Sequence, residues 1–318
     1  MFLLFLILAL LTACQSPDPV NLEPTAEPPP PTIPLIPPIQ PGDGSDLIDQ
    51  LLEAGVIRVG IRVWPEAEFS PPAFRGFAEG TLGTPLNGFE VEIAHLMAEG
   101  LGLELELVEA YPPVILSGDW QGQWDVALAS IVPFDQPISR RMYFSQPYAY
   151  VPMGILIPAT NDSIKTFEQL AGQRVGVLEF SAYDRLLTSD SIVLTVYKQR
   201  LLPALPEDIR PRPVSNLQKT IRQMGNPTAT LEFDALFGPA PVFREATRNQ
   251  AVKLAPGAEN LGLQPLVVAA VPQDGLEVER LIAEINTVFD RAERQGILAE
   301  IYLRWYGQDL SRVERIGD

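Results

Sequence analysis

The sequence predicts an α/β fold, and two features of the chain carry that prediction. Short apolar runs typical of buried strands alternate with stretches in which apolar residues recur every three or four positions, as on one face of a helix. The alternation occurs in two similar cycles, and 318 residues suffice for two domains with cores of ordinary size. Such alternation builds sheets whose strands are joined by right-handed crossovers.

The first cycle follows a short helix that we expect over 46–54 and that ends at Gly55. The elements expected next are strands over 56–63, 103–108 and 124–130 and a helix over 89–101. The run WDVALAS is continuously apolar after its aspartate, which favours a strand buried in a parallel sheet. His95 lies off the apolar stripe of its helix, so we expect a solvated side chain.

The second cycle has the same order. Its expected elements are helices over 167–171, 182–187, 217–224 and 276–294 and strands over 174–178, 231–237 and 266–271. Ser181 precedes one helix and fits an N-cap. The stretch FDALFGPAPVF is expected to be a buried strand running into a loop that contains Pro239 and Pro241.

Composition excludes several classes of function. A net charge of −17 argues against a nucleic-acid surface, which needs a basic face, and disfavours anionic lipid headgroups as partners. One cysteine allows no internal disulfide. One histidine and one cysteine exclude metal sites built on several such ligands, and we expect no metal and no cofactor.

The N-terminal segment resembles a lipoprotein signal. Residues 1–14 form an apolar run shorter than a membrane-spanning helix needs, and Leu11-Thr12-Ala13-Cys14 resembles the lipobox at which bacterial lipoproteins are cut and lipidated. No Lys or Arg precedes the run, and the alternative is a buried core cysteine. Residues 15–44 are rich in proline, which favours an extended, semi-rigid tether.

Seven stretches, in this order, resemble the extracellular solute-binding proteins of polar amino-acid ABC transporters, which have the type II periplasmic-binding-protein fold. They are GVIRVGIRV, PLNGFEVEIAHLMAEGLGLELELV, WDVALASI, YFSQPYAY, FEQLAGQRVGVLEFSAYDRLL, FDALFG and INTVFDRAERQGILAEIYLRWYG. The resemblance runs from about Gly55 to Gly307, which is nearly the whole expected folded body.

The resemblance implies a two-lobed, periplasmic-binding-protein-like α/β fold with the ligand between the lobes. Lobe 1 is expected over 46–150 and 265–318 and lobe 2 over 151–264, joined by two hinge crossovers at Tyr148–Met153 and Gly262–Pro265. Both crossovers fall at proline-containing joints between apolar runs. Ligands of open α/β sheets sit beyond the carboxyl ends of the strands, so such a cleft can be reached from both lobes.

Two regions of lobe 1 correspond to ligand-contacting positions of the family. Where the family has an aromatic residue after its first strand, this chain has FSPPAF, so Phe69 or Phe74 is expected to stack on a ligand or to plug the lobe edge. After the strand that follows Asp125, Ser130 is kept as a contact. Val132 takes the place of the usual threonine, which removes one hydrogen bond.

The family's ionic contacts are changed. The arginine that clamps the ligand carboxylate in the family corresponds to Ile138 here. Arg140 and Arg141 follow, and either one of them reaches the cleft through a shifted loop or the pair stays solvated beside it.

In lobe 2, one ligand-contacting position of the family keeps its residue type and another does not. Ser181 matches a hydroxyl residue of the family, with a role in ligand binding or as an N-cap alone. Five residues after Asp234, where the family carries an aspartate for the ligand ammonium, stands Pro239. A buried ammonium without a counter-charge is costly, so the ligand is not an α-amino acid, or Glu179 substitutes, or no ligand is bound.

These expectations give a leading function and two alternatives. The leading one is a monomeric, lipid-anchored, extracytoplasmic binding protein that delivers a small polar solute to an ABC permease and is not an enzyme. The alternatives are a sensing or scaffold domain that partners a membrane receptor, and a dehydratase-like enzyme on the same fold.

Overall fold

The structure is a computed structural model. It describes residues 38–63, 74–75, 86–133, 142–188, 195–196, 199–200, 205–257 and 261–309. The expected signal segment and most of the expected tether therefore lie outside the described residues.

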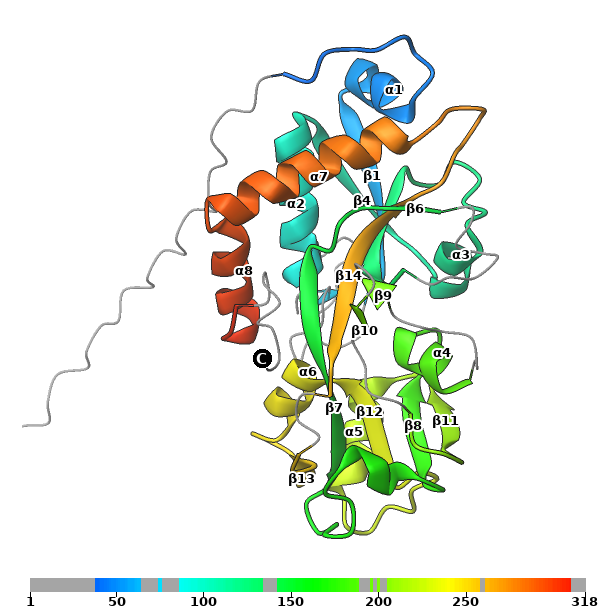
Figure 1. The fold of residues 1–318 in the computed structure, drawn as a ribbon, viewed down its shortest axis with the longest axis vertical. Helices are drawn as coiled ribbons and strands as arrows, with labels where there is room; N and C mark the ends of the chain where they lie inside the picture. Colours follow the sequence, from blue (N-terminus) through cyan, green and yellow to red (C-terminus); the bar gives the residue numbers. More distant parts are fainter. Residues whose placement is uncertain are drawn as a thin grey trace, which may run out of the picture. The chain divides into compact units, whose positions relative to one another are not determined.

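Strands and helices alternate along most of the described chain (Figure 1). The strands are β1 Val56–Ile61, β2 Phe74–Arg75, β3 Leu86–Asn87, β4 Glu104–Glu109, β5 Val126–Ile131, β6 Tyr143–Phe144, β7 Ala149–Pro158, β8 Arg174–Leu178, β9 Thr195–Val196, β10 Gln199–Arg200, β11 Arg210–Val214, β12 Ala235–Pro239, β13 Val252–Leu254 and β14 Leu263–Ala270. The helices are α1 Leu47–Ala54, α2 Phe89–Leu101, α3 Pro112–Ser117, α4 Ala182–Thr188, α5 Leu217–Gly225, α6 Ala240–Ala246, α7 Glu279–Arg294 and α8 Ile297–Tyr306, with a 3-10 helix at Phe167–Leu170.

The main sheet consists of two halves with the same strand pattern. In the first half β1 lies between β4 and β5, all three parallel, and β14 pairs antiparallel with β5. In the second half β8 lies between β11 and β12, again all parallel, and β7 pairs antiparallel with β12. The two cycles predicted from the sequence are therefore confirmed as two α/β halves with the same strand order.

The two halves are joined through the long strands β7 and β14. These strands pair antiparallel with one another, from Leu263 opposite Pro152 to Leu266 opposite Ala149. Each strand then continues into a different half, β7 beside β12 and β14 beside β5 (Figure 1). All eight residues of β14 are buried, so the connection is part of the core.

An arginine–aspartate clamp occurs once in each half. In the first half the Arg58 guanidinium donates to both Asp125 carboxylate oxygens, at 2.6 and 3.2 Å, and the Arg58 backbone N–H donates to the same carboxylate at 2.7 Å. In the second half Arg174 repeats all three contacts with Asp234, at 2.7, 3.1 and 3.0 Å. Each aspartate precedes the strand beside the arginine's strand, so the clamp fixes the register of neighbouring parallel strands.

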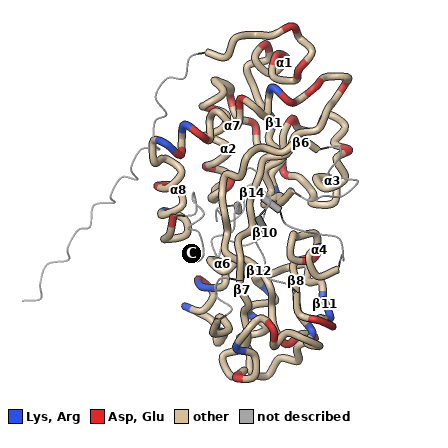
Figure 2. The backbone as a smooth tube through the Cα atoms, in the orientation of Figure 1, with Lys and Arg blue, Asp and Glu red and all other residues tan. Residues whose placement is uncertain are grey.

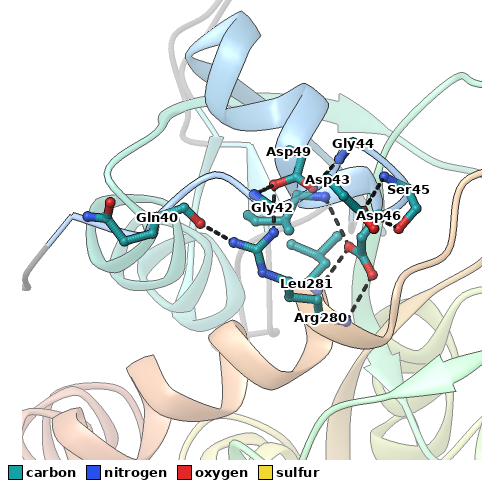
Figure 3. Close-up of polar contacts among 10 residues, drawn as sticks. Gln40, Gly42, Asp43, Gly44, Ser45, Asp46, Asp49, Arg280 and Leu281 are labelled. Atoms are coloured by element: carbon teal, nitrogen blue, oxygen red, sulfur yellow. Dashed lines mark hydrogen bonds and ion pairs between the residues drawn. The ribbon is translucent and has the colours of Figure 1, made fainter.

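Hydrogen bonds hold the residues that precede α1 against helices of the first half (Figure 3). The Asp46 carboxylate accepts hydrogen bonds from the backbone of Ile48 in α1 and from Arg280 and Leu281 in α7. One buried carboxylate thus caps the first turns of two helices. Asp49 accepts from the Gly42 and Gly44 amides and from Arg280.

Most predicted elements agree with the structure within a few residues. The helix predicted over 89–101 and the strand predicted over 174–178 match α2 and β8 residue for residue. His95 is exposed on α2, as expected.

The stretch FDALFGPAPVF folds differently from the prediction. Its strand begins only at Ala235, because Asp234 is engaged with Arg174, and Pro239 is followed by helix α6 and not by a loop. Pro241 lies in the first turn of that helix, where a missing N–H costs nothing. The two prolines therefore start a helix.

Charged residues are spread over both halves of the sheet (Figure 2). Acidic positions lie along α1, α2 and α8 and again near β11, and the basic positions form no continuous stripe in the described part of the chain. No described helix combines the length and apolar character needed to cross a membrane.

The clamps give a first prediction. Asp125→Ala removes the carboxylate from a side chain that is 4% exposed and leaves the Arg58 guanidinium without its partner, so it should lower the free energy of unfolding by about 3 kcal/mol. Asp234→Ala should lower the free energy of unfolding by a smaller amount, because both members of its pair are more exposed. Urea denaturation followed by circular dichroism measures both. The prediction would be contradicted if Asp125→Ala and Asp234→Ala lowered the free energy of unfolding equally. It would also be contradicted if Asp162→Ala, which breaks an exposed ion pair, lowered it as much as Asp125→Ala.

Candidate ligand-binding cleft

A cleft lies where the parallel strands of the two halves end. Its inner pocket is lined from the first half by Arg62 and Ser130, from the second half by Phe237 and Pro239, and from β14 by Gln264. Arg62 follows β1, Ser130 and Pro239 lie in the last two residues of β5 and β12, Phe237 lies within β12, and Gln264 belongs to β14. The arrangement is the one expected for ligand sites of open α/β sheets, where the carboxyl ends of strands meet.

The walls of the inner pocket are mainly apolar. The apolar side chains that form them are Val151, Leu178, Leu217, Phe237, Val242 and Leu266. No aspartate or glutamate is among the described residues that line it, and Arg62 is the charged residue there. The cavity volume of this inner part is about 70 Å³, which suits an apolar group of modest size.

A second, outer pocket of about 300 Å³ opens beside the first. It is lined by Arg62, by Glu109 at the end of β4 and Tyr111 beyond it, and by Glu179 and Phe180 after β8. The Tyr111 and Phe180 rings meet edge to face from the two halves, with centroids 6.4 Å apart. Arg62 and Phe180 line both pockets, so the two form one continuous cleft.

A buried carboxyl group supports the first-half wall of the cleft. Oε1 of Glu90, near the start of α2, accepts from the Ser130 amide at 2.5 Å, the Ser130 hydroxyl at 3.1 Å and the Tyr148 hydroxyl at 2.5 Å. Oε2 is buried and has no hydrogen-bond partner among the described residues. Burial raises the pKa of Glu90 from its ordinary value of 4.5 to about 7, against the effect of these hydrogen bonds.

The backbone at both walls is in an unusual conformation. Ser130 has φ 53° and Phe180 has φ 59°, in the left-handed region that residues other than glycine rarely adopt. The Glu90 contacts hold Ser130 in place, and the Asp184 carboxylate accepts from the Phe180 amide. Such strain persists only where neighbouring contacts enforce it, and it is frequent at functional sites.

Arg62 is half-buried where the pockets meet. Burial lowers the pKa of its guanidinium, and the charges of Glu90 and Glu179 oppose that effect. The group stays charged at neutral pH, because the ordinary pKa of arginine is far above 7. A half-buried cation, on which the charges of Glu90 and Glu179 act, therefore lies where the two pockets meet.

The sequence of the folded body identifies the family. Residues 61–308 match the sequence profile described as bacterial extracellular solute-binding proteins, family 3. This chain belongs to that family. The two-lobed solute-binding fold implied by the sequence resemblance is thereby confirmed, with its lobes joined through β7 and β14.

Two relatives of this solute-binding protein are similar to it at low sequence identity. The L-cystine-binding protein TcyJ of Escherichia coli (strain K12) is 24% identical over 267 residues, covering 84% of this chain and 88% of the relative. A probable amino-acid ABC transporter-binding protein of Haemophilus influenzae is 22% identical over 227 residues, covering 71% and 79%.

Solved structures share the fold. The amino acid ABC transporter substrate-binding protein AbpA of Streptococcus pneumoniae, bound to L-arginine, has a TM-score of 0.61 at 16% identity and covers 83% of this chain and 100% of its own. An ancestral arginine-binding protein bound to glutamine has a TM-score of 0.58 at 22% identity, covering 80% and 99%. The ancestral amino acid-binding protein AncCDT-1, a precursor of cyclohexadienyl dehydratase, has a TM-score of 0.58 at 19% identity, covering 81% and 99%.

Three of the predicted site residues lie at the cleft of the solute-binding protein. Ser130 and Ser181 line the inner pocket and Glu179 lines the outer pocket. Ser130 gives its amide and hydroxyl protons to Glu90, so only its hydroxyl oxygen remains to accept from a ligand. The Ser181 hydroxyl accepts from the Asp184 amide, which is the N-cap role left open by the sequence.

The other predicted residues are not placed by the structure. Phe69, Arg140, Arg141 and Cys14 lie outside the described residues, and for Phe74 only the backbone of β2 is described. Val132, at the usual threonine position, is described and is buried. The ligand roles proposed for these residues remain predictions.

Sequence reasoning missed Arg62 and Gln264. Arg62 fell inside the strand predicted over 56–63, whereas β1 ends at Ile61 and leaves Arg62 at its carboxyl end. Gln264 is a polar residue in the apolar run LQPLVVAA, and it is only 5% exposed. The signals were present: a charge just past a strand end, and an amide within a buried strand.

Glu90 gives a prediction about pH. A carboxyl group whose pKa is raised on folding stabilises the protein fully below its unfolded pKa of 4.5, and that stabilisation is lost as the pH rises through about 7. Glu90→Gln mimics the protonated form, so its free energy of unfolding should exceed that of the wild type increasingly between pH 5 and about 8. Urea denaturation across this pH range measures the difference. Glu92→Gln removes a charge from the same helix outside the cleft and should not reproduce the curve; if it does, the assignment to Glu90 is wrong.

Proposed function

We propose that this protein is the substrate-binding component of an ABC transporter. It binds a small solute between its two lobes and delivers it to a permease as a monomer anchored outside the cytoplasm. The lobes comprise residues 46–150 with 265–318 and residues 151–264. The observation that carries the proposal is a cleft lined from both halves of the sheet and from the joining strands, within a chain of the solute-binding family.

The joining strands allow the two halves to close around a solute. In the described part of the sheet only β7 and β14 connect the halves, and they are paired over Leu263–Leu266. A small change in backbone angles near this pairing moves one half relative to the other as a rigid body. The Tyr111 and Phe180 rings already meet across the cleft in this structure, so the two halves are in contact at its mouth.

The solute is recognised differently from a standard amino acid. The inner pocket is lined by Pro239 and by no described carboxylate, so a ligand ammonium would have no counter-charge there. The acidic side chains Glu109 and Glu179 belong to the outer pocket, where Arg62 lies beside them. Binding in this pocket relies on Arg62, neutral polar groups and apolar contacts.

The function is binding without chemical conversion. His95, which a Ser-His-Asp arrangement would need, is exposed on α2. The buried acid of the cleft wall, Glu90, is committed through Oε1 to Ser130 and Tyr148.

Adding a carboxylate to the inner pocket tests the altered recognition. Pro239→Asp places an acid at the N-cap of α6, a position that favours aspartate, so the fold should tolerate the change. Binding of L-leucine, measured by isothermal titration calorimetry, should tighten by about tenfold or more, because the ligand ammonium gains a partner.

Pro239→Asn serves as the matched control, because it offers a similar shape and an equally good N-cap without the charge. It should leave L-leucine binding close to that of the wild type. Equal gains from Asp and Asn, or tight L-leucine binding by the unmodified protein, would contradict the altered-recognition proposal.

Lipid anchoring is the second part of the proposed function, and Cys14 is the proposed lipidation site. The support is the resemblance of Leu11–Cys14 to a lipobox and the proline-rich segment that follows it. When the full-length gene is expressed in a bacterium that processes lipoproteins, the wild type should fractionate with membranes and Cys14→Ser should not. Membrane association of both forms, after a salt wash, would rule out Cys14 as the anchor.

A further inference from the structure

We propose that the cleft takes a small monocarboxylate that has no ammonium group, with its carboxylate at Arg62, its apolar body in the inner pocket and a neutral hydroxyl or carbonyl group at Gln264. This inference rests on the proposed function, because it names the ligand class of the same cleft.

Arg62 is the group that selects an anion. It lines the inner pocket, the outer pocket and a smaller pocket against Ile115 and Leu116, so every described part of the cleft reaches it. Arg62 is half-buried, and burial lowers the pKa of its guanidinium while the charges of Glu90 and Glu179 oppose that effect. The planar fork of a guanidinium matches the two oxygens of a carboxylate.

The inner pocket selects an apolar body. Its walls include Val151, Leu178, Phe237 and Leu266, and its modest volume suits a short branched chain better than a long polar one. Burying methylene groups there removes apolar surface from water and favours binding. The carboxylate and the apolar body therefore find complementary surfaces on neighbouring parts of one cleft.

Gln264 selects a neutral polar group. Its side chain is 5% exposed, lines the inner pocket and makes no hydrogen bond to another described residue. A buried amide of this kind gains when a ligand supplies a hydroxyl or carbonyl oxygen. A primary ammonium can bond to the amide oxygen, but its charge would remain unbalanced, since no described acid lines this pocket.

Matched probes test the ligand class on the unmodified protein. They are 4-methylpentanoate, its 2-hydroxy derivative, its 2-amino derivative L-leucine, and the uncharged 4-methylpentanamide. Isothermal titration calorimetry with the full chain should give the tightest binding for the 2-hydroxy acid, and binding at least about tenfold weaker for L-leucine and for the amide. This comparison needs no variant, so it does not depend on how a substitution folds.

Variants then assign the roles. Arg62→Gln should weaken both acids by at least about tenfold and leave the amide unchanged. Arg248→Gln removes the same charge from an exposed position outside the cleft and should have no effect. Gln264→Leu should abolish the preference for the 2-hydroxy acid over 4-methylpentanoate.

The outcomes separate this inference from the proposed function. If L-leucine or another standard amino acid binds as tightly as the acids, or if Arg62→Gln leaves acid binding intact, the ligand class is wrong and the transport role stands. If no acid, amide or standard amino acid binds, both are overturned.

Discussion

A bidentate arginine–aspartate clamp, made once in each half, is the contact on which the arrangement of the cleft depends. Arg58 with Asp125 and Arg174 with Asp234 each tie a parallel strand to the start of its neighbour, through backbone as well as side-chain hydrogen bonds. Once the strand starts are level, the strand ends are level too. Residues at or near those ends then line one cleft from both halves.

The cleft combines a rigid wall with an unusual distribution of charge. Glu90 holds Ser130 and Tyr148 with one oxygen, which couples α2, the end of β5 and the residue just before β7. The cationic Arg62 lies at the opening of an apolar pocket that contains neutral polar groups. The solute-binding fold of the family is present, and no described aspartate or glutamate lines the inner pocket, which is the observation behind the proposed change of ligand class.

Much of this architecture could be read from the sequence, because periodicity and glycine stops are local signals. The helix at 89–101 and the strand at 174–178 were predictable for that reason. The α6 helix was not, since two prolines suggest a loop unless their position in a first turn is known. Ser130, Glu179 and Ser181 were found at the cleft through family resemblance, whereas Arg62 required the true end of β1, which propensity does not fix.

The double cap at Asp46 also determines how force enters the protein. A pull that arrives along the chain at residue 38 meets the contacts of Gly42 and Gly44 with Asp49 and then the Asp46 carboxylate, which spans α1 and α7. Both helices belong to the half built around β1. A force applied at residue 38 would therefore act first on the half built around β1 and not on the half built around β8.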